Sequence, residues 1–142
     1  MRFQYNDGGR EAAGYRGKTR DCVVRAIAIA TSSPYQEIYD LVAGKSTTER
    51  TVRGRSKSSA RNGVHKKTFK TLLADLGWQW VPVMSIGSGC SMHMTDGELP
   101  SGRVIVSLSK HLAAVIDGVL HDTDDCSRGG TRCVYGYWTK GS

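Results

Sequence analysis

The stretch TRDCVVRAIAIAT, which runs from Thr19 to Thr31, places one cysteine at the front of a segment too apolar for a surface helix. Asp21 is a favoured N-cap residue, which predicts a helix that begins at Cys22 and ends near Thr31. Its apolar residues lie all around the axis, as is typical of a helix buried in the middle of a domain. Cys22 has a plain explanation as a core residue, because free cysteine is among the most buried residue types. A functional explanation requires a partner for its thiol elsewhere in the chain.

The length and composition predict one soluble globular domain over residues 1–142. A chain of 142 residues can bury roughly two thirds of the surface that its unfolded form exposes. Its 39% hydrophobic and 23% charged residues are ordinary for a folded protein. No apolar run approaches the ~20 residues needed to cross a bilayer, and the start of the chain lacks the apolar core of a secretory signal. We therefore expect a cytoplasmic protein without a membrane partner.

The four cysteines do not show the spacing of a zinc site or a disulfide framework. No C-x-x-C pair occurs, so we expect no metal and no other cofactor. A chain of this length without a secretory signal also does not predict disulfides. One alternative remains, in which the loop CSRGGTRC brings Cys126 and Cys133 together, with His121 nearby, as a redox or metal clip.

The net charge of +7 is concentrated in the middle of the chain, where Glu49 is the only acid between Lys45 and Lys70. Residues 45–64 are polar and have no apolar period, which predicts a basic, flexible insert. Such a concentration of positive charge attracts polyanions, so a nucleic acid or an acidic protein is a candidate partner. The alternative is a solvated loop whose charge aids solubility. The candidate polyanion-binding residues are Arg53, Arg55, Lys57, Arg61, Lys66 and Lys67.

Two further helices are predicted after the first. In SSPYQEIYDLVAG, we expect Ser33 to cap a helix and Pro34 to occupy its first position. Gln36 would complete a capping box, and Gly44 would end the helix. The apolar stripe of HKKTFKTLLADLG predicts a third helix over residues 65–76.

The second half of the chain changes to strand patterns. WQWVPVM alternates, RVIVSLS is typical of a buried strand, and HLAAVIDGVLHDT predicts a hairpin that turns at Asp117 and Gly118. CVYGYW predicts a last strand, and MRFQYNDGGR predicts a short strand or arm at the start. Helices followed by strands predict the α+β class, with N-terminal helices packed on a C-terminal antiparallel sheet.

The hairpin places a histidine beside carboxylates. Counting outward from the turn puts His111, Asp122 and Asp124 on one face of the two strands. Asp124 is then directly opposite His111 and Asp122 is diagonal to it, both within reach of a ring nitrogen. A carboxylate beside a histidine fixes its tautomer and orientation, which a general base requires. Taken singly, His111 is also explained as an edge-strand histidine, and the two aspartates as turn residues.

His111 supplies the partner that the thiol of Cys22 requires. A helix N-terminus stabilises a thiolate, and an adjacent imidazolium lowers its pKa further. A cysteine at the start of a buried helix, a histidine at the start of a later strand and an aspartate on the next strand resemble the papain-like cysteine peptidases. The order DCVVRAIAIAT, two more helices, KHLAAVIDG and VLHDT is most similar to the bacteriocin-processing, double-glycine-leader branch. This resemblance covers nearly the whole chain.

The resemblance implies a role for each of these residues. Cys22 would be the nucleophile and His111 the general base and acid. Asp122 would orient His111, with Asp124 as the alternative. The family usually has a glutamine six residues before the cysteine that helps to form the oxyanion hole, and this chain has Arg16 there.

Several groups are candidates to replace that glutamine. They are Arg16 itself, Lys18, the backbone N–H of Cys22, and Asn6. The replacement matters, because removing one oxyanion donor typically costs on the order of a hundredfold or more in rate. Asp21 raises a second question, since a negative charge beside Cys22 opposes thiolate formation.

Two functions follow from these expectations. The first is a small cysteine hydrolase or peptidase that acts on an amide or isopeptide-type bond of a peptide or protein substrate. Loop 85–102 and the basic insert are the natural places to hold such a substrate, because loops carry specificity on rigid scaffolds. The second is a catalytically silent papain-like module that binds nucleic acid or an acidic protein through the insert.

Overall fold

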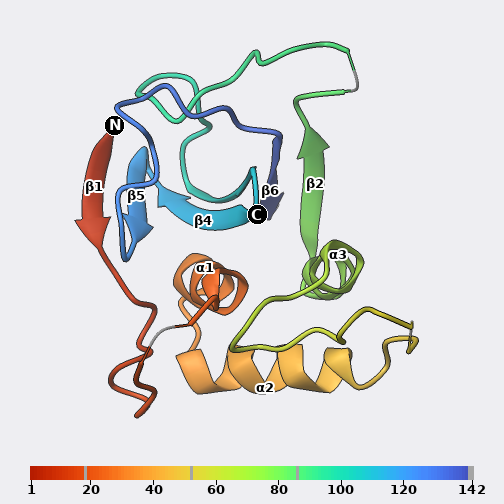
Figure 1. Ribbon diagram of the computed structural model, residues 1–142. Coiled ribbons are helices and arrows are strands. Elements are labelled where there is room, and N and C mark those ends of the chain that lie inside the picture. Colours follow the sequence, from red (N-terminus) through yellow and green to blue (C-terminus); the bar gives the residue numbers. More distant parts are fainter. Residues whose placement is uncertain (18, 52, 86, 141–142) are drawn as a thin grey trace.

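Three helices cover one face of a six-stranded sheet in a computed structural model that describes residues 1–17, 19–51, 53–85 and 87–140 (Figure 1). The strands are β1 (Arg2–Tyr5), β2 (Trp78–Pro82), β3 (Arg103–Leu108), β4 (His111–Ile116), β5 (Val119–Asp122) and β6 (Gly136–Lys140). Their order across the sheet is β1-β5-β4-β3-β6-β2. The predicted α+β class is confirmed. Among the described residues, no helix combines the length and apolar character that crossing a membrane requires.

The sheet is mixed, so the prediction of an antiparallel sheet is wrong at one edge. β1 pairs with β5 in parallel, with Arg2 opposite Val119 and Tyr5 opposite Asp122. Parallel neighbours need a long connection, and here all three helices and three other strands lie between the two partners in the chain. The remaining pairs of neighbouring strands are antiparallel.

The β4–β5 hairpin has the predicted turn and register. Asp117 and Gly118 have φ values of 48° and 79°, as a two-residue type I′ turn requires. Ala114 lies opposite His121, as counted from the sequence. The ladder ends at that pair, however, and β5 ends at Asp122. Asp124 therefore does not lie in a strand opposite His111, which corrects the prediction for that residue.

The apolar helix that carries the cysteine is α1 (Cys22–Thr31), with the predicted bounds. It lies centrally beneath the sheet and packs mainly on β4 (Figure 1). Every residue from Val23 to Ala30 is buried except Arg25. Asp21 occupies the N-cap position, but its side chain makes no capping hydrogen bond. The prediction of a side-chain cap is therefore wrong, because the carboxylate bonds to Tyr35 and Thr19 instead.

The other helices are α2 (Tyr35–Ser46) and α3 (Lys66–Asp75). The capping box predicted for α2 does not form, since Pro34 is the N-cap residue and no side chain caps the helix. The amide of Gln36 instead donates to Asp40. Gly44 lies within α2, which continues to Ser46, so the predicted end is too early.

The sheet has a hydrophobic core on each face. On the helical side, α1, α2 and α3 pack against Ile105, Leu112 and Trp138. On the other side, Met94 and Val134 cover the sheet from the two long loops that precede β3 and β6 (Figure 1). This second layer contains no helix among the described residues, so its order depends on loop packing.

A disulfide between Cys90 and Cys133 joins these two loops, with Cα atoms 5.9 Å apart. The expectation of no disulfide is therefore wrong, and so is the pairing of Cys133 with Cys126. Cys22 and Cys126 are free thiols. The last strand also begins later than predicted, at Gly136. A Cβ atom there would lie 2.3 Å from the ring of Trp80, so only glycine fits.

The segment predicted as a basic insert begins within α2, which ends at Ser46. Its described residues beyond that helix are irregular, and its single acid ties it to α3. The carboxylate of Glu49 accepts the backbone N–H of Ser58 at 2.6 Å and the hydroxyls of Ser58 and Thr68. A bridge between Ser59 and Gly63 closes the end of the segment. One acid among many bases thus serves as an internal anchor.

Candidate active site

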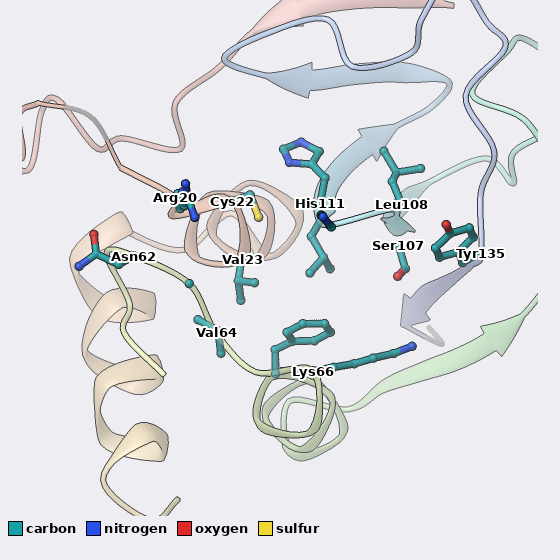
Figure 2. Close-up of a pocket in the computed structure, with 14 residues that line it drawn as sticks. Arg20, Cys22, Val23, Asn62, Val64, Lys66, Ser107, Leu108, His111 and Tyr135 are labelled. Atoms are coloured by element: carbon teal, nitrogen blue, oxygen red, sulfur yellow. The ribbon is translucent and has the colours of Figure 1, made fainter. Parts of the chain in front are cut away.

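Cys22 is the first residue of α1 and lines a pocket of about 440 Å³ (Figure 2). The first N–H groups of a helix have no intrahelical acceptor, and the side chain of Asp21 does not satisfy those of α1. The thiol therefore sits where the partial positive charge of the helix favours a thiolate.

His111 lines the same pocket as Cys22, from the first residue of β4 (Figure 2). Its Nε2 lies 2.6 Å from Oδ2 of Asp122, whose side chain is only 5% exposed. The other carboxylate oxygen accepts the backbone N–H of Thr123 at 2.7 Å. Since Asp122 engages Nε2, Nδ1 is the ring nitrogen left to act on the thiol. The carboxylate thus fixes the orientation and tautomer of the imidazole.

The electrostatics of the three groups favour a thiolate–imidazolium pair. Burial raises the pKa of Cys22, but hydrogen bonding to His111 and its positive charge outweigh that effect, and the pKa falls below its ordinary value of 9.0. Burial alone would lower the pKa of His111, yet its contacts with Asp122, Cys126 and Cys22 raise it to about 11. For Asp122, burial is likewise outweighed by His111, and its pKa is lowered. All three groups therefore stabilise one another in their charged forms.

The structure brings together Cys22, His111 and Asp122 and leaves Asp124 outside. Asp124 is exposed and lines a second hollow on the other side of His111. It forms no hydrogen bond or ion pair with His111, whereas Asp122 does. The choice between the two aspartates that the sequence leaves open therefore falls on Asp122.

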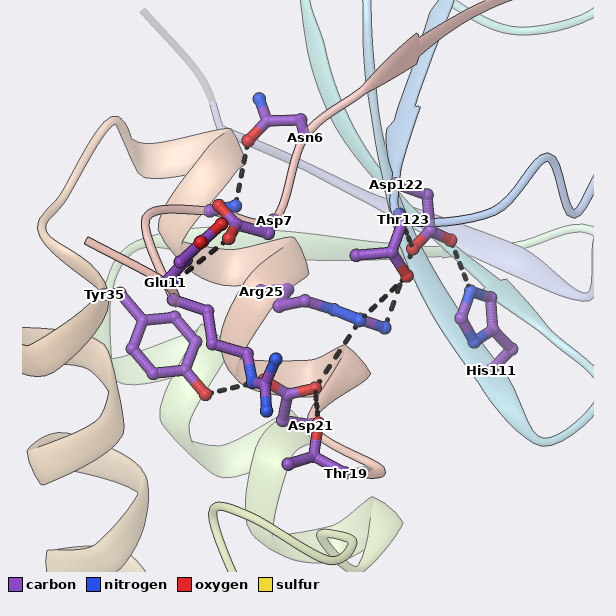
Figure 3. Close-up of polar contacts among 12 residues, drawn as sticks. Asn6, Asp7, Glu11, Thr19, Asp21, Arg25, Tyr35, His111, Asp122 and Thr123 are labelled. Carbon is purple, nitrogen blue, oxygen red and sulfur yellow. Dashed lines mark hydrogen bonds and ion pairs between the residues drawn. The ribbon is translucent and has the colours of Figure 1, made fainter. Parts of the chain in front are cut away.

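Arg25 connects the candidate triad to Asp21 (Figure 3). Its guanidinium lies 3.5 Å from Asp21 and 3.6 Å from Asp122, and donates to the hydroxyl of Thr123. It also lowers the pKa of both Cys22 and Asp122 through its charge, in each case as a smaller effect than His111. Sequence reasoning did not assign Arg25 a role, although it is the only charged residue in the run from Cys22 to Thr31.

The negative charge of Asp21 is matched within the same network. Its carboxylate accepts the Tyr35 hydroxyl at 2.6 Å and lies within 3.6 Å of both Arg10 and Arg25. Arg10 and Arg25 therefore compensate the negative charge of Asp21 beside the start of α1.

Cys126 is a second thiol at the same histidine. It interacts with the His111 side chain, and together His111, Asp122 and Cys126 offer donor atoms within 4.8 Å of one another. Nitrogen, sulfur and carboxylate donors at this spacing could hold a borderline metal ion such as zinc. From the sequence, Cys126 is considered only as a candidate partner of Cys133 across a short loop, and its contact with His111 is not predicted.

The residues considered for the oxyanion hole are not gathered at the pocket. Arg16 is exposed, and its carbonyl accepts the guanidinium of Arg61 at 2.6 Å. Asn6 bonds to His121 and to the backbone of Gly8, away from Cys22. Lys18 lies outside the described residues. The backbone N–H of Cys22, at the uncapped start of α1, is the candidate that the geometry retains.

The six residues considered for polyanion binding do not line a single pocket. Lys66 lines the Cys22 pocket, whereas Arg55 and Lys67 line a separate hollow of about 400 Å³ that also holds Glu49. Arg53 and Lys57 are exposed in the insert. Arg61 is half-buried and bonds to the segment before α1, so its role is structural.

A helix-borne thiol, an imidazole and a buried carboxylate in this order can perform nucleophilic attack with general acid–base assistance. No protein-family model, curated protein or solved structure matches the chain. The proposal for its chemistry therefore depends on the geometry of Cys22, His111 and Asp122.

Proposed function

We propose that this chain is a small cysteine hydrolase of the papain-like type that acts on an amide or isopeptide-type bond. One observation carries the proposal: the thiol at the start of α1 shares a pocket with His111, whose Nε2 lies 2.6 Å from the buried carboxylate of Asp122. Nucleophile, base and orienting acid in this relation form the arrangement by which thiol hydrolases work.

The reaction starts from the Cys22 thiolate and the His111 imidazolium. The sulfur attacks the carbonyl carbon, and the backbone N–H of Cys22 stabilises the negative oxygen. The C–N bond then breaks as His111 donates its proton to the leaving amine, which leaves an acyl-enzyme. Water attacks the acyl carbon while His111 takes its proton. The C–S bond breaks, and the carboxylic acid leaves with the thiolate and imidazolium restored.

The test is the rate at which iodoacetamide alkylates each cysteine as a function of pH, resolved by mass spectrometry. In the parent protein, Cys22 is expected to react with an apparent pKa below the ~8.5 of a free thiol. His111→Ala removes the imidazolium and should shift that profile upward. His121→Ala, which removes an imidazole that bonds to Asn6 away from Cys22, is the matched control. The proposal would be overturned if Cys22 were unreactive, or if its pH profile were the same in the parent and in His111→Ala.

A catalytically silent module that binds polyanions is the second candidate. Arg53, Arg55 and Lys57 favour it, because they are exposed and none forms an ion pair with another described residue. Binding of this kind falls steeply with salt, as condensed counterions are released. Salt-dependent binding of an oligonucleotide to a protein whose Cys22 is unreactive would select this function over the hydrolase.

A further inference from the structure

Three cations surround the Cys22 pocket, and no carboxylate lines it. Arg20 precedes α1, Lys66 begins α3, and Lys110 lies in the turn between β3 and β4. All three side chains are exposed, and none forms an ion pair within the part of the chain that the structure describes. None of the 14 lining residues drawn in Figure 2 is an aspartate or a glutamate. These charges are therefore available to a molecule that enters the pocket.

The backbone of Lys110 has a conformation that is uncommon for lysine. Its φ of 56° lies in the left-handed region, where glycine or asparagine is favoured. At the other end of β4, the turn uses Asp117 and Gly118, which are the residues such turns favour. Lys110 thus adopts, beside His111, a backbone conformation that glycine would adopt at lower cost.

The remainder of the lining is largely apolar. Val64, Phe69 and Leu112 contribute side chains to the pocket, whose volume of about 440 Å³ is within the range of ligand sites. Such a pocket accommodates the stem of an aspartate or glutamate side chain while the cations hold its carboxylate. The pocket fits a single-stranded nucleic acid less well. Such ligands bind by stacking their bases on aromatic side chains, and Tyr135 is the only exposed aromatic residue in the lining.

We infer that the substrate is a peptide segment with an aspartate or glutamate next to the bond that reacts at Cys22. Arg20, Lys66 and Lys110 are the residues that determine this specificity. The inference rests on the proposed hydrolase function, and it adds the class of substrate. It also assigns the basic side chains nearest Cys22 to substrate recognition, separately from those that surround Glu49.

Peptide acyloxymethyl ketones test this directly, because Cys22 displaces their carboxylate and forms a C–S bond only where the thiolate is reactive. Three probes are compared that differ in one residue beside the ketone, which is aspartate, asparagine or lysine. The aspartate probe is expected to label Cys22 on the order of tenfold faster than the lysine probe at low salt, with the asparagine probe between them. The difference should shrink in 0.5 M salt.

Substitutions then assign the preference to the pocket. Lys66→Gln is expected to reduce the ratio of aspartate to lysine labelling on the order of twofold, and Lys110→Asn likewise. Asparagine tolerates the left-handed backbone, so the second variant keeps the turn. Lys67→Gln is the matched control, because it removes the same charge from the adjacent residue of α3, whose side chain lines the other hollow. Equal effects of Lys66→Gln and Lys67→Gln would overturn the inference.

The readout separates failure of the inference from failure of the proposed function. If Cys22 labels rapidly with all three probes at equal rates, the hydrolase proposal stands and the acidic substrate does not. If Cys22 reacts with none of them, nor with iodoacetamide, the hydrolase proposal fails and the inference fails with it. Protection of Cys22 by a single-stranded oligonucleotide, with no preference among the peptide probes, would overturn the inference in favour of nucleic acid.

Discussion

The guanidinium of Arg25 lies 3.6 Å from the carboxylate of Asp122, so a cation from the helix that carries Cys22 also holds the acid that orients His111. The same guanidinium lies 3.5 Å from Asp21. The side chains of Asp21 and Asp122 are 0% and 5% exposed, respectively. A cation between two buried carboxylates offsets the cost of burying their charges. Arg25 is therefore a positioning residue for the candidate site.

Replacement of Arg25 by methionine should affect both stability and the thiol. The variant leaves buried carboxylates without their shared cation, which we expect to cost about 3 kcal/mol in the free energy of unfolding. It should also raise the pKa of Cys22, because the charge of Arg25 contributes to lowering it. Urea unfolding measures the first effect, and the pH profile of Cys22 alkylation measures the second. Arg25→Lys keeps the charge and should preserve most of the profile. If the pH profile of Cys22 alkylation were unchanged in Arg25→Met, Arg25 would have no role in positioning the candidate site.

The pKa values of His111 and His121 should be shifted in opposite directions from that of a free histidine. Contacts with Asp122, Cys126 and Cys22, which outweigh burial, raise the pKa of His111 to about 11, whereas burial and the charge of Arg103 lower the pKa of His121. NMR titration should therefore find His111 protonated and His121 neutral at pH 7.5. Asp122→Asn and Cys22→Ala should each lower the pKa of His111. A parent His111 that titrates near 6.5 would exclude the ion pair.

The raised pKa of His111 also sets the sign of its contribution to stability. Its folded value of about 11 exceeds the value of 6.5 expected for the unfolded chain. The protonated imidazole therefore stabilises the fold fully below pH 6.5, and this contribution is lost as pH rises toward 11. His111→Ala should flatten this part of the stability curve in urea unfolding between pH 6 and pH 10. The lowered pKa of Cys22 contributes with the opposite sign, so both curves are measured in a Cys22→Ala background, where a curve that rises over this range would contradict the assignment.

Local patterns were enough to predict the parts of the fold that carry the site. The run from Cys22 to Thr31 is apolar on all sides and bounded by polar residues, which fixes α1. Asp117 and Gly118 fix the hairpin turn, and the side-chain period of two then fixes which face His111 occupies. Each of these inferences spans only a few residues, and such short-range signals are read directly from sequence.

Features that depend on distant partners could not be read in the same way. Nothing in Arg2–Tyr5 indicates that this strand pairs in parallel with β5. The spacing of four cysteines does not select Cys90 for Cys133, since connectivity is set by loop packing. Asp21 has the residue type of an N-cap, but Arg25 and Tyr35 provide buried partners that a local pattern does not reveal.

Glu49 is expected to anchor the basic insert through its carboxylate. Burial alone would raise the pKa of Glu49, but the hydroxyls of Ser58 and Thr68, an N–H of Ser58 and the charge of His65 lower it to about 2. A depressed pKa stabilises the fold above the unfolded value of 4.5, and this stability is lost as pH falls toward 2. Glu49→Gln should cost about 2 kcal/mol at pH 7.

Hydrogen exchange and urea unfolding measure this anchor. In Glu49→Gln, amides of residues 45–64 should exchange faster than in the parent, and the stability difference should shrink as the pH approaches 3. Glu37→Gln is the matched control, because it removes an exposed carboxylate of α2 that pairs with no other described residue. Equal exchange in the two variants would show that the insert does not depend on Glu49.

The disulfide between Cys90 and Cys133 predicts a definite thiol count. Alkylation under denaturing, non-reducing conditions should modify Cys22 and Cys126 only, and prior reduction should expose all four cysteines. The bridge spans a sequence separation of 43, so removing it with Cys90→Ser and Cys133→Ser together should cost about 4 kcal/mol in the chain-entropy description. The loops that it joins cover the face of the sheet opposite Cys22, so the reactivity of Cys22 should persist in this double variant. Four free thiols in protein isolated under oxidising conditions would contradict the bridge.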